Sequence, residues 1–134
     1  KKGVIDRGFA DFLTERGPAL ISLIVSAPEE KPDAAKDEML AKIATIRQTG
    51  ISEEALSTAK RSLLGQYAFQ SETPSGRAQT YGFYYAISDP QFANTYISCI
   101  QAIANEDIIR VAQKYMDPNR AAIVLIGPSR KDSP

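Results

Sequence analysis

Residues 51–88 read ISEEALSTAKRSLLGQYAFQSETPSGRAQTYGFYYAIS, and this stretch decides how the rest of the chain is organised. Ser52 predicts a helix N-cap, because its hydroxyl can accept a hydrogen bond from a first-turn amide. Ile51 and Leu56 flank that cap at the spacing of a hydrophobic staple. Thr73-Pro74 ends this helix and begins another, since proline is tolerated in a first turn. The stretch therefore predicts two consecutive helices that meet at a proline hinge.

The first of these helices has one apolar face. Leu56, Ala59, Leu63 and Tyr67 recur at helical spacing, whereas Lys60, Arg61 and Gln66 fall largely off that face. Because Leu63 lies in the middle of the stripe, we expect it to anchor the helix in the core.

Length and composition bound what the chain can be. Its 134 residues, 43% of them hydrophobic, are typical of a single domain with a core of its own. Sixteen basic residues balance sixteen acidic ones, which argues against a nucleic-acid partner. No apolar run is long enough to cross a membrane, so a soluble protein is expected. The chain begins Lys-Lys-Gly, which we interpret as the start of a piece of a longer protein.

Three segments predict β-strands. Residues 8–15 alternate in polarity and residues 19–26 are continuously apolar, so together they predict an antiparallel hairpin with a short turn at residues 16–18, the second strand being central. Residues 121–126, AAIVLI, are apolar throughout, which is typical of a strand buried on both faces of a sheet. The expected fold is α/β in the broad sense (α+β): a mostly antiparallel sheet with helices packed on it.

Three further helices are predicted. One begins at Pro32 and ends at Gly50, and we expect it to form a hairpin with the next helix over the sheet. Another spans residues 91–103, and Asn105 is expected to cap the last one. The inner faces of these helices are given by Ala35, Met39, Ile43 and Ile46 in the first, by Phe92, Tyr96, Cys99 or Ile100, and Ile103 in the second, and by Ile108, Ala112 and Tyr115 in the third.

An aromatic cluster on the helix after the proline hinge is the strongest candidate for a contact surface. Tyr81, Phe83, Tyr84 and Tyr85 cannot all be buried on one helical face, so some of them are expected to face a cleft or a partner. Arg77 precedes Tyr81 by one helical turn and could stack on it or contact a substrate or partner. The candidate contact residues are therefore Arg77, Tyr81 and Tyr84.

Other polar groups give no sign of catalysis. The acidic pairs Glu53-Glu54 and Glu106-Asp107 stand at predicted helix starts, where the helix dipole favours negative charge, and a third pair is Glu29-Glu30. The single cysteine, Cys99, has no obvious activating neighbour and is expected to be a small core residue. The sequence contains no histidine, which removes the commonest general base and zinc ligand. We therefore expect no catalytic residue and no metal site in this chain.

The order of these segments is similar to that in the pitrilysin/insulinase-type zinc metallopeptidases. The helix start at residues 51–60 carries the resemblance first. It continues in order through Gly76-Arg77-Ala78, Tyr96-Ile97 with Ile100, Asn105-Glu106-Asp107-Ile108, Val111 to Met116, Pro118-Asn119-Arg120 and the apolar segment before Gly127-Pro128. By this resemblance, residues 1–128 correspond to the C-terminal portion of a peptidase-like domain in the second, non-catalytic half, and residues 129–134 to a frayed tail.

The resemblance implies a protein that closes around a peptide. In the family, two halves close like a clamshell, and an H-x-x-E-H helix with a downstream glutamate holds zinc in the catalytic half. This chain lacks that motif, so the implied zinc belongs to the catalytic half of the same or a partner chain. The second half often supplies an arginine and a tyrosine; alignment places the arginine before Lys1 and Asp6 at the tyrosine position. No catalytic residue is therefore carried over.

Three functions follow as hypotheses. The chain is a non-catalytic fragment of a zinc peptidase that contributes structure and chamber wall, or it is part of an inactive family member that acts as a scaffold or assembly subunit. A standalone module that binds small molecules or peptides is disfavoured, because no convergent polar cluster is visible in the sequence. The chain resembles the second half of bacterial processing-peptidase-like proteins of this family, which implies the bacterial cytoplasm or periplasm as the compartment.

Overall fold

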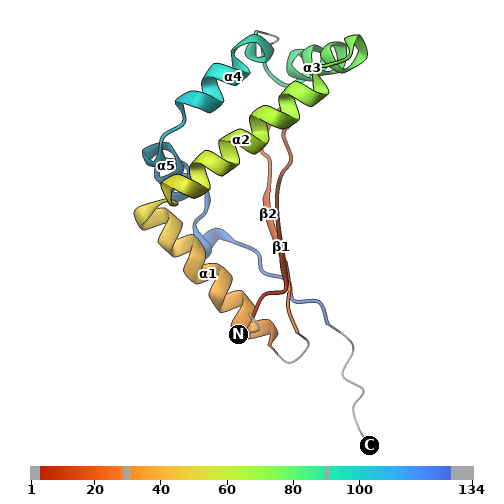
Figure 1. Ribbon diagram of the computed structural model, residues 1–134. Coiled ribbons are helices and arrows are strands. Elements are labelled where there is room, and N and C mark those ends of the chain that lie inside the picture. Colours follow the sequence, from red (N-terminus) through yellow and green to blue (C-terminus); the bar gives the residue numbers. More distant parts are fainter. Residues whose placement is uncertain (1–3, 29–30, 90, 128–134) are drawn as a thin grey trace, which may run out of the picture.

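The computed structural model describes residues 4–28, 31–89 and 91–127, and these form an α+β fold, as the sequence predicts (Figure 1). The predicted tail and the Glu29-Glu30 pair lie outside the described residues. In chain order the elements are β1 (Arg7–Phe12), β2 (Ile21–Ser26), α1 (Pro32–Thr49), α2 (Glu53–Gln70), α3 (Pro74–Ile87), α4 (Phe92–Ala102), α5 (Asn105–Tyr115) and a short 3-10 helix, η1 (Pro118–Arg120).

The predicted antiparallel hairpin is confirmed. β1 and β2 pair so that Phe9 lies opposite Ile24 and Phe12 lies opposite Ile21. The connection is longer than the short turn expected, because it takes up all of residues 13–20. Gly17 within it has a φ of 120°, a conformation that favours glycine. The second strand is not central in the described part of the chain, since β1 is its one paired neighbour there.

The helix boundaries around residues 50–52 follow the local chemistry that the sequence predicts. Gly50 ends α1 with a φ of 74°, and its N–H donates to the carbonyl of Ile46 at 2.9 Å. The Ser52 hydroxyl accepts a hydrogen bond from the Ala55 N–H at 3.2 Å, which caps α2. Leu56, the inner residue of the predicted staple, is 8% exposed.

The proline hinge is also confirmed. The Thr73 hydroxyl accepts from the Gly76 N–H at 3.0 Å, and Pro74 occupies the first turn of α3. Beyond the hinge, α3 and α4 both pack against α2, and α3 also packs against α4. Figure 1 shows α2, α3 and α4 as one layer at the top of the molecule.

The partner of α1 differs from the expectation. We expected a hairpin of α1 with α2, but α1 packs along α5 instead, and α1 and α2 diverge from Gly50 (Figure 1). Polar bonds fix this packing: the Arg47 guanidinium donates to the Met116 carbonyl at 2.7 Å, and the Gln113 amide donates to the Arg47 carbonyl at 2.9 Å.

Asn105 is not the N-cap that the sequence predicts. It is the first residue of α5, and Ala104 occupies the cap position. The Asn105 side chain instead bridges the connection between α1 and α2, where Oδ1 accepts from the Ile51 N–H at 2.9 Å and Nδ2 donates to the Thr49 carbonyl at 3.0 Å. The cap function passes to Asp107, whose carboxylate accepts from the Ala104 N–H at 3.0 Å.

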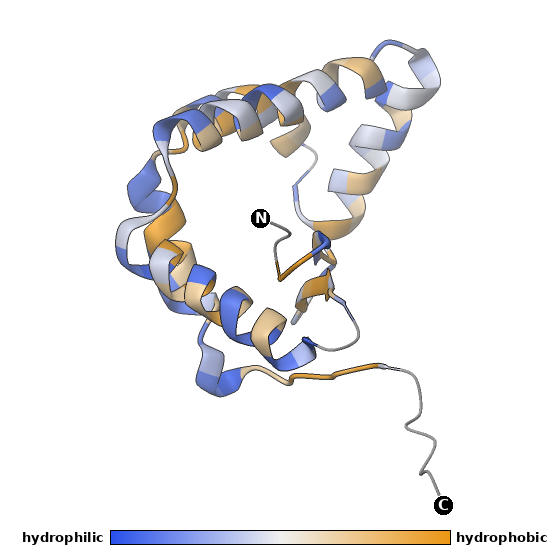
Figure 2. Cartoon of the chain, turned by 60° about the horizontal axis from the view of Figure 1, so that its bottom comes forward, coloured by the Kyte–Doolittle hydropathy of each residue, from blue (hydrophilic) through white to orange (hydrophobic). Residues whose placement is uncertain are grey.

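Residues 121–126 do not form the predicted strand within the described part of the chain. They run extended after η1, away from the helices (Figure 2). An extended segment becomes a strand only when a neighbour pairs with its backbone. Among the described residues, β1 and β2 pair with each other and not with this segment.

The core is small, and five residues predicted to face it are exposed instead: Ala59, Leu63, Phe92, Cys99 and Tyr115. The buried residues in the described chain are Ala35, Gly50, Leu56, Thr80, Ala93 and Ala112. Leu63 is 38% exposed, whereas Leu64 and Tyr67 on the same helix are half-buried. Cys99 is exposed, and Ile100 takes the inward position of that turn.

Candidate functional site

A hollow of about 290 Å³ opens between α2, α3 and α4. Its walls are aromatic and aliphatic, with two glutamine amides on the α2 side. It is lined by Leu63, Gln66, Tyr67, Gln70, Thr80, Phe83, Tyr84 and Tyr96. Concave, mostly apolar sites with a few polar groups are the usual form of ligand-binding sites.

Aromatic contacts set the shape of this hollow. Tyr67 and Tyr96 stack with their ring centroids 4.7 Å apart and their planes 17° from parallel. Tyr84 packs at a tilt against Phe92 at 5.1 Å and against Tyr96 at 6.3 Å. The Tyr67 hydroxyl donates to the Ala93 carbonyl at 2.5 Å, which fixes α4 on α2. These rings form a preorganised wall, because stacked and tilted pairs are favourable aromatic arrangements.

The hydroxyls of Tyr84 and Tyr96 in the wall stay protonated at neutral pH. Burial raises the pKa of Tyr84, and the neighbouring Tyr96 and Tyr67 phenols raise it further. Burial also raises the pKa of Tyr96, with Tyr67 as the second cause. These hydroxyls can donate and accept hydrogen bonds, but they are poor general bases at pH 7.

The structure does not bring the three candidate contact residues into one site. Tyr84 lines the hollow, whereas Tyr81 is exposed and its hydroxyl donates to Asn94 on α4. The Arg77 guanidinium donates to the Ser71 carbonyl at 3.3 Å, across the hinge between α2 and α3. A contact role for Arg77, Tyr81 and Tyr84 therefore stays a prediction, with Tyr84 best placed among them.

Sequence reasoning missed the polar side of the hollow. Gln66 was placed off the packed face of its helix, and Gln70 was not considered. A signal was nevertheless present, because Leu63, Gln66, Tyr67 and Gln70 share one stripe with spacing i, i+3, i+4, i+7. Such a mixture of polar and aromatic residues along one stripe predicts the edge of a buried helix face, where polar side chains can line a hollow.

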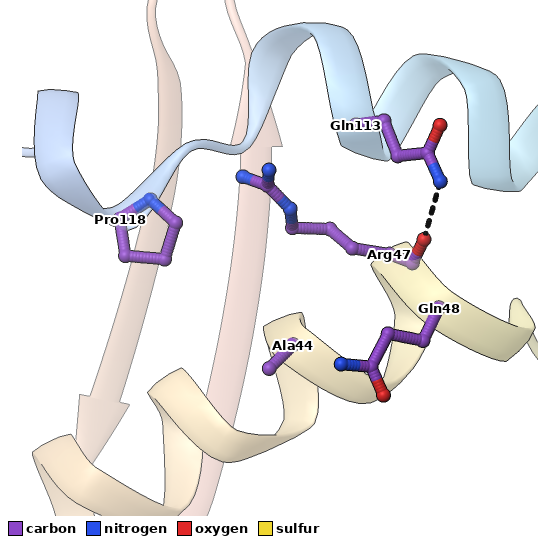
Figure 3. Close-up of a pocket in the computed structure, with 5 residues that line it drawn as sticks. All are labelled: Ala44, Arg47, Gln48, Gln113 and Pro118. Atoms are coloured by element: carbon purple, nitrogen blue, oxygen red, sulfur yellow. Dashed lines mark hydrogen bonds between the residues drawn. The ribbon is translucent and has the colours of Figure 1, made fainter.

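A second hollow, of about 440 Å³, lies at the joint between α1 and α5 (Figure 3). Ala44, Arg47, Gln48, Gln113 and Pro118 line it. The Arg47 guanidinium extends towards η1, where it donates to Met116 and lies 3.7 Å from the Asp117 carboxylate. Because Arg47 already has these partners, we assign the second hollow a structural role.

The acidic pairs on α2 and α5 lie at the starts of these helices. Glu53 and Glu54 stand in the first turn of α2, and Glu106 and Asp107 in that of α5, as expected. The Arg110 guanidinium donates to Asp107 at 2.9 Å and, with the Ala104 N–H, holds the pKa of the Asp107 carboxyl below its usual value. In the described ranges, no three His, Cys, Asp or Glu residues cluster as metal ligands.

Comparisons with known proteins identify a fold and no family. No family profile matches the chain, and no curated protein matches it in sequence. Among solved structures, the chain is similar to a protease from Helicobacter pylori, with a TM-score of 0.73 and 18% sequence identity. The match covers 85% of this chain and 28% of the protease, so the chain spans little more than a quarter of that protein.

The chain therefore has the α+β fold of a portion of a protease structure. Identity this low establishes the fold alone. In addition, no helix in the described residues combines the length and the apolar character that a membrane crossing requires.

Proposed function

We propose that this chain is part of a peptidase related to the pitrilysin/insulinase-type zinc metallopeptidases, in the half that does not bind the metal. In this role it contributes structure and a wall of the chamber that holds a peptide substrate, next to a catalytic half in the same or a partner chain. Positioning of the peptide and exclusion of water are the contributions of such a wall.

The observation that carries this proposal is the fold match. A portion of a protease superimposes on 85% of this chain, although the sequences share 18% identity. The choice of the pitrilysin/insulinase-type family comes from the ordered resemblance of the segments from residue 51 to residue 128. The hollow between α2, α3 and α4 is a surface that could face a peptide or the catalytic half.

The residues of this chain do not fit a zinc site. Zinc in peptidases takes three protein ligands, mainly histidine with glutamate, cysteine or aspartate. The sequence has no histidine, its one thiol is exposed, and no three His, Cys, Asp or Glu residues cluster in the part of the chain that the structure describes. The zinc of the proposed peptidase would be held elsewhere, and no step of the reaction is assigned to this chain.

A scaffold is the second candidate. The low identity to the protease and the absence of a zinc motif from this chain would also fit an inactive family member that acts as an assembly subunit. An H-x-x-E-H motif in the protein that carries this chain would favour the peptidase, and its absence would favour the scaffold.

The test uses the longer protein that the proposal implies. We expect that protein to cleave unstructured peptides and to hold zinc, and the 134-residue chain alone to do neither. Deletion of residues 1–128 should abolish turnover or reduce it severely while zinc stays bound to the remainder. Undiminished turnover after the deletion would contradict the chamber-wall role, and a complete longer protein without turnover would favour the scaffold.

The candidate contact residues are tested in the same protein. The combined variant Arg77→Ala, Tyr81→Ala and Tyr84→Ala should lower peptide turnover or the association of the halves more than it lowers the melting temperature. Arg61→Ala with Tyr115→Ala is a matched control, because these residues are of the same types and are exposed on α2 and α5. Equal effects of the two variants would exclude a specific contact role.

A further inference from the structure

The segment after η1 has the composition of an interior strand and the environment of a surface loop. All six residues from 121 to 126 are apolar, whereas a strand with one face in water alternates apolar and polar residues. Yet Val124 is 77% exposed and Ile126 is 94% exposed, and Ile123 and Leu125, which point to the opposite side of an extended chain, are exposed too. Both sides of the segment therefore lack a cover.

The backbone of this segment is as open as its side chains. The Ala121 N–H donates to the Pro118 carbonyl at 3.3 Å, and within the described part of the chain residues 122–126 form no further backbone hydrogen bond. Unpaired backbone groups in an apolar segment are a template for another strand. Burial of such a segment requires that these groups be paired.

The β1–β2 hairpin also has unpaired strand edges within the described chain, and exposed apolar side chains. Each of its strands pairs on one side alone among the described residues, and Phe9, Phe12, Leu20 and Ile24 are exposed. Two-stranded hairpins are marginal in water, and at least three strands or a covering helix stabilise them. The segment of residues 121–126 crosses the lower end of the hairpin in the view of Figure 1 but lies apart from it in Figure 2, and the two are not paired.

We propose that residues 121–126 are an interior strand of a larger sheet. Apolar β-strands from outside this chain would pair with the two edges of this strand, one strand along each edge. These strands belong to the remainder of the protease-like domain, so this inference rests on the proposed function. The recognition is by backbone hydrogen bonds along the segment and by apolar side chains on both of its faces.

The extent of the fold match favours the remainder of the domain over a second copy of the chain. The protease has more than two-thirds of its chain beyond the matched portion, which is enough for additional strands. Two copies of a six-residue segment would pair along one edge each and leave the other edge open.

Amide hydrogen exchange of residues 122–126 tests the proposal directly. In the 134-residue chain these amides should exchange close to the rate of an unstructured peptide, whereas in the longer protein they should exchange at least about 100-fold more slowly. The amides of residues 109–114 in α5 are the internal control, since their helical hydrogen bonds should protect them in both proteins.

Three outcomes would overturn the proposal. Protection in the isolated chain that rises with protein concentration would assign the edges to a second copy. Protection there that is independent of concentration would assign them to the hairpin of the same chain. Fast exchange in the longer protein would show that the segment stays unpaired.

A pair of variants adds a second measurement. Val124→Lys and Phe69→Lys place the same charge at two positions that are each 77% exposed. Both should leave the melting temperature of the isolated chain unchanged, and Val124→Lys alone should lower that of the longer protein by several degrees. Equal lowering by both variants would contradict a strand-specific role.

The two proposals fail separately. Slow exchange at residues 122–126 in a longer protein without peptide turnover would support the sheet and contradict the peptidase. Turnover together with fast exchange at these residues would do the opposite.

Discussion

The joint around Gly50 and the strand region (β1, β2 and residues 121–126) differ in how completely their groups are packed or hydrogen-bonded. At the joint, the Asn105 amide binds Thr49 and Ile51, and Arg47 binds the Met116 carbonyl. In the strand region, apolar side chains of β1, β2 and residues 121–126 are exposed. The joint thus pairs its polar groups within the chain, whereas the strand region leaves apolar side chains exposed.

Hydrogen-bond geometry explains the difference. A helix pairs its backbone groups within one segment, so α1 to α5 form from local sequence and need one another mainly for side-chain packing. A strand must pair with another strand, and its neighbour in a sheet can be far away in the sequence. A portion of an α+β domain therefore keeps its helical joints more readily than its sheet.

The largest expected effect compares one buried and one exposed aliphatic residue. Leu56→Ala should lower the free energy of unfolding of the isolated chain by about 2–5 kcal/mol, because a buried leucine leaves a cavity. Ile126→Ala should change it by less than about 0.5 kcal/mol. Urea denaturation of both variants measures the difference. A loss at Ile126 as large as that at Leu56 would show that the strand region is already buried and would break the comparison.

A substitution at Gly50 tests whether the joint is as tightly specified as its hydrogen bonds indicate. Gly50→Ala should cost about 1–3 kcal/mol, because a side chain is strained at a φ of 74° and its Cβ would overlap the Asn105 amide. The same substitution in an Asn105→Ala background should cost less, since the overlap is gone. Strict additivity in this double-mutant cycle, measured by urea denaturation, would contradict the coupling of the two residues.

The aromatic wall should contribute a smaller amount. Tyr67→Phe removes the hydroxyl that donates to the Ala93 carbonyl and keeps the ring that stacks on Tyr96, so the expected loss is about 1 kcal/mol. Tyr85→Phe is the control, because Tyr85 is exposed and should be neutral. Thermal unfolding of the two variants is the measurement. Equal melting temperatures would show that the Tyr67 hydroxyl does not stabilise the packing of α4 on α2.

Local chemistry made part of this structure predictable from the sequence. Ser52 was identified as a cap, Thr73-Pro74 as the boundary between two helices, and Gly50 as a helix end, because each of these functions depends on the neighbouring backbone. The same reasoning failed for Asn105, whose amide could serve either its own helix or the distant Gly50 joint. Geometry between elements decided for the joint, and no local pattern contains that information.

Packing decided the remaining failures. Leu63 has the right spacing for a core residue, but it lines the open hollow between α2, α3 and α4 and is 38% exposed there. The aromatic cluster correctly predicted that some of its rings are exposed. Gln66 and Gln70 were missed because glutamine on a helix is equally common on a solvent face. For residues 121–126, composition predicted a strand, but a pairing partner cannot be read from the strand itself.

The smallest expected effect is a pH dependence at the start of α5. The Arg110 guanidinium and the Ala104 N–H lower the pKa of the Asp107 carboxyl from its ordinary value of 3.8. The folded chain thus binds this proton less readily than the unfolded chain, so the stabilisation is fully present above pH 3.8 and is lost as the pH falls through the folded pKa. Asp107→Asn should remove this part of the acid sensitivity, whereas Glu106→Gln removes a charge from the same turn and keeps both hydrogen bonds. Helix content of the three proteins, followed by circular dichroism through an acid titration, measures the difference. The same acid sensitivity in the Asp107→Asn variant and the parent would show that Asp107 does not stabilise α5, and the helical side of the comparison would then depend on packing alone.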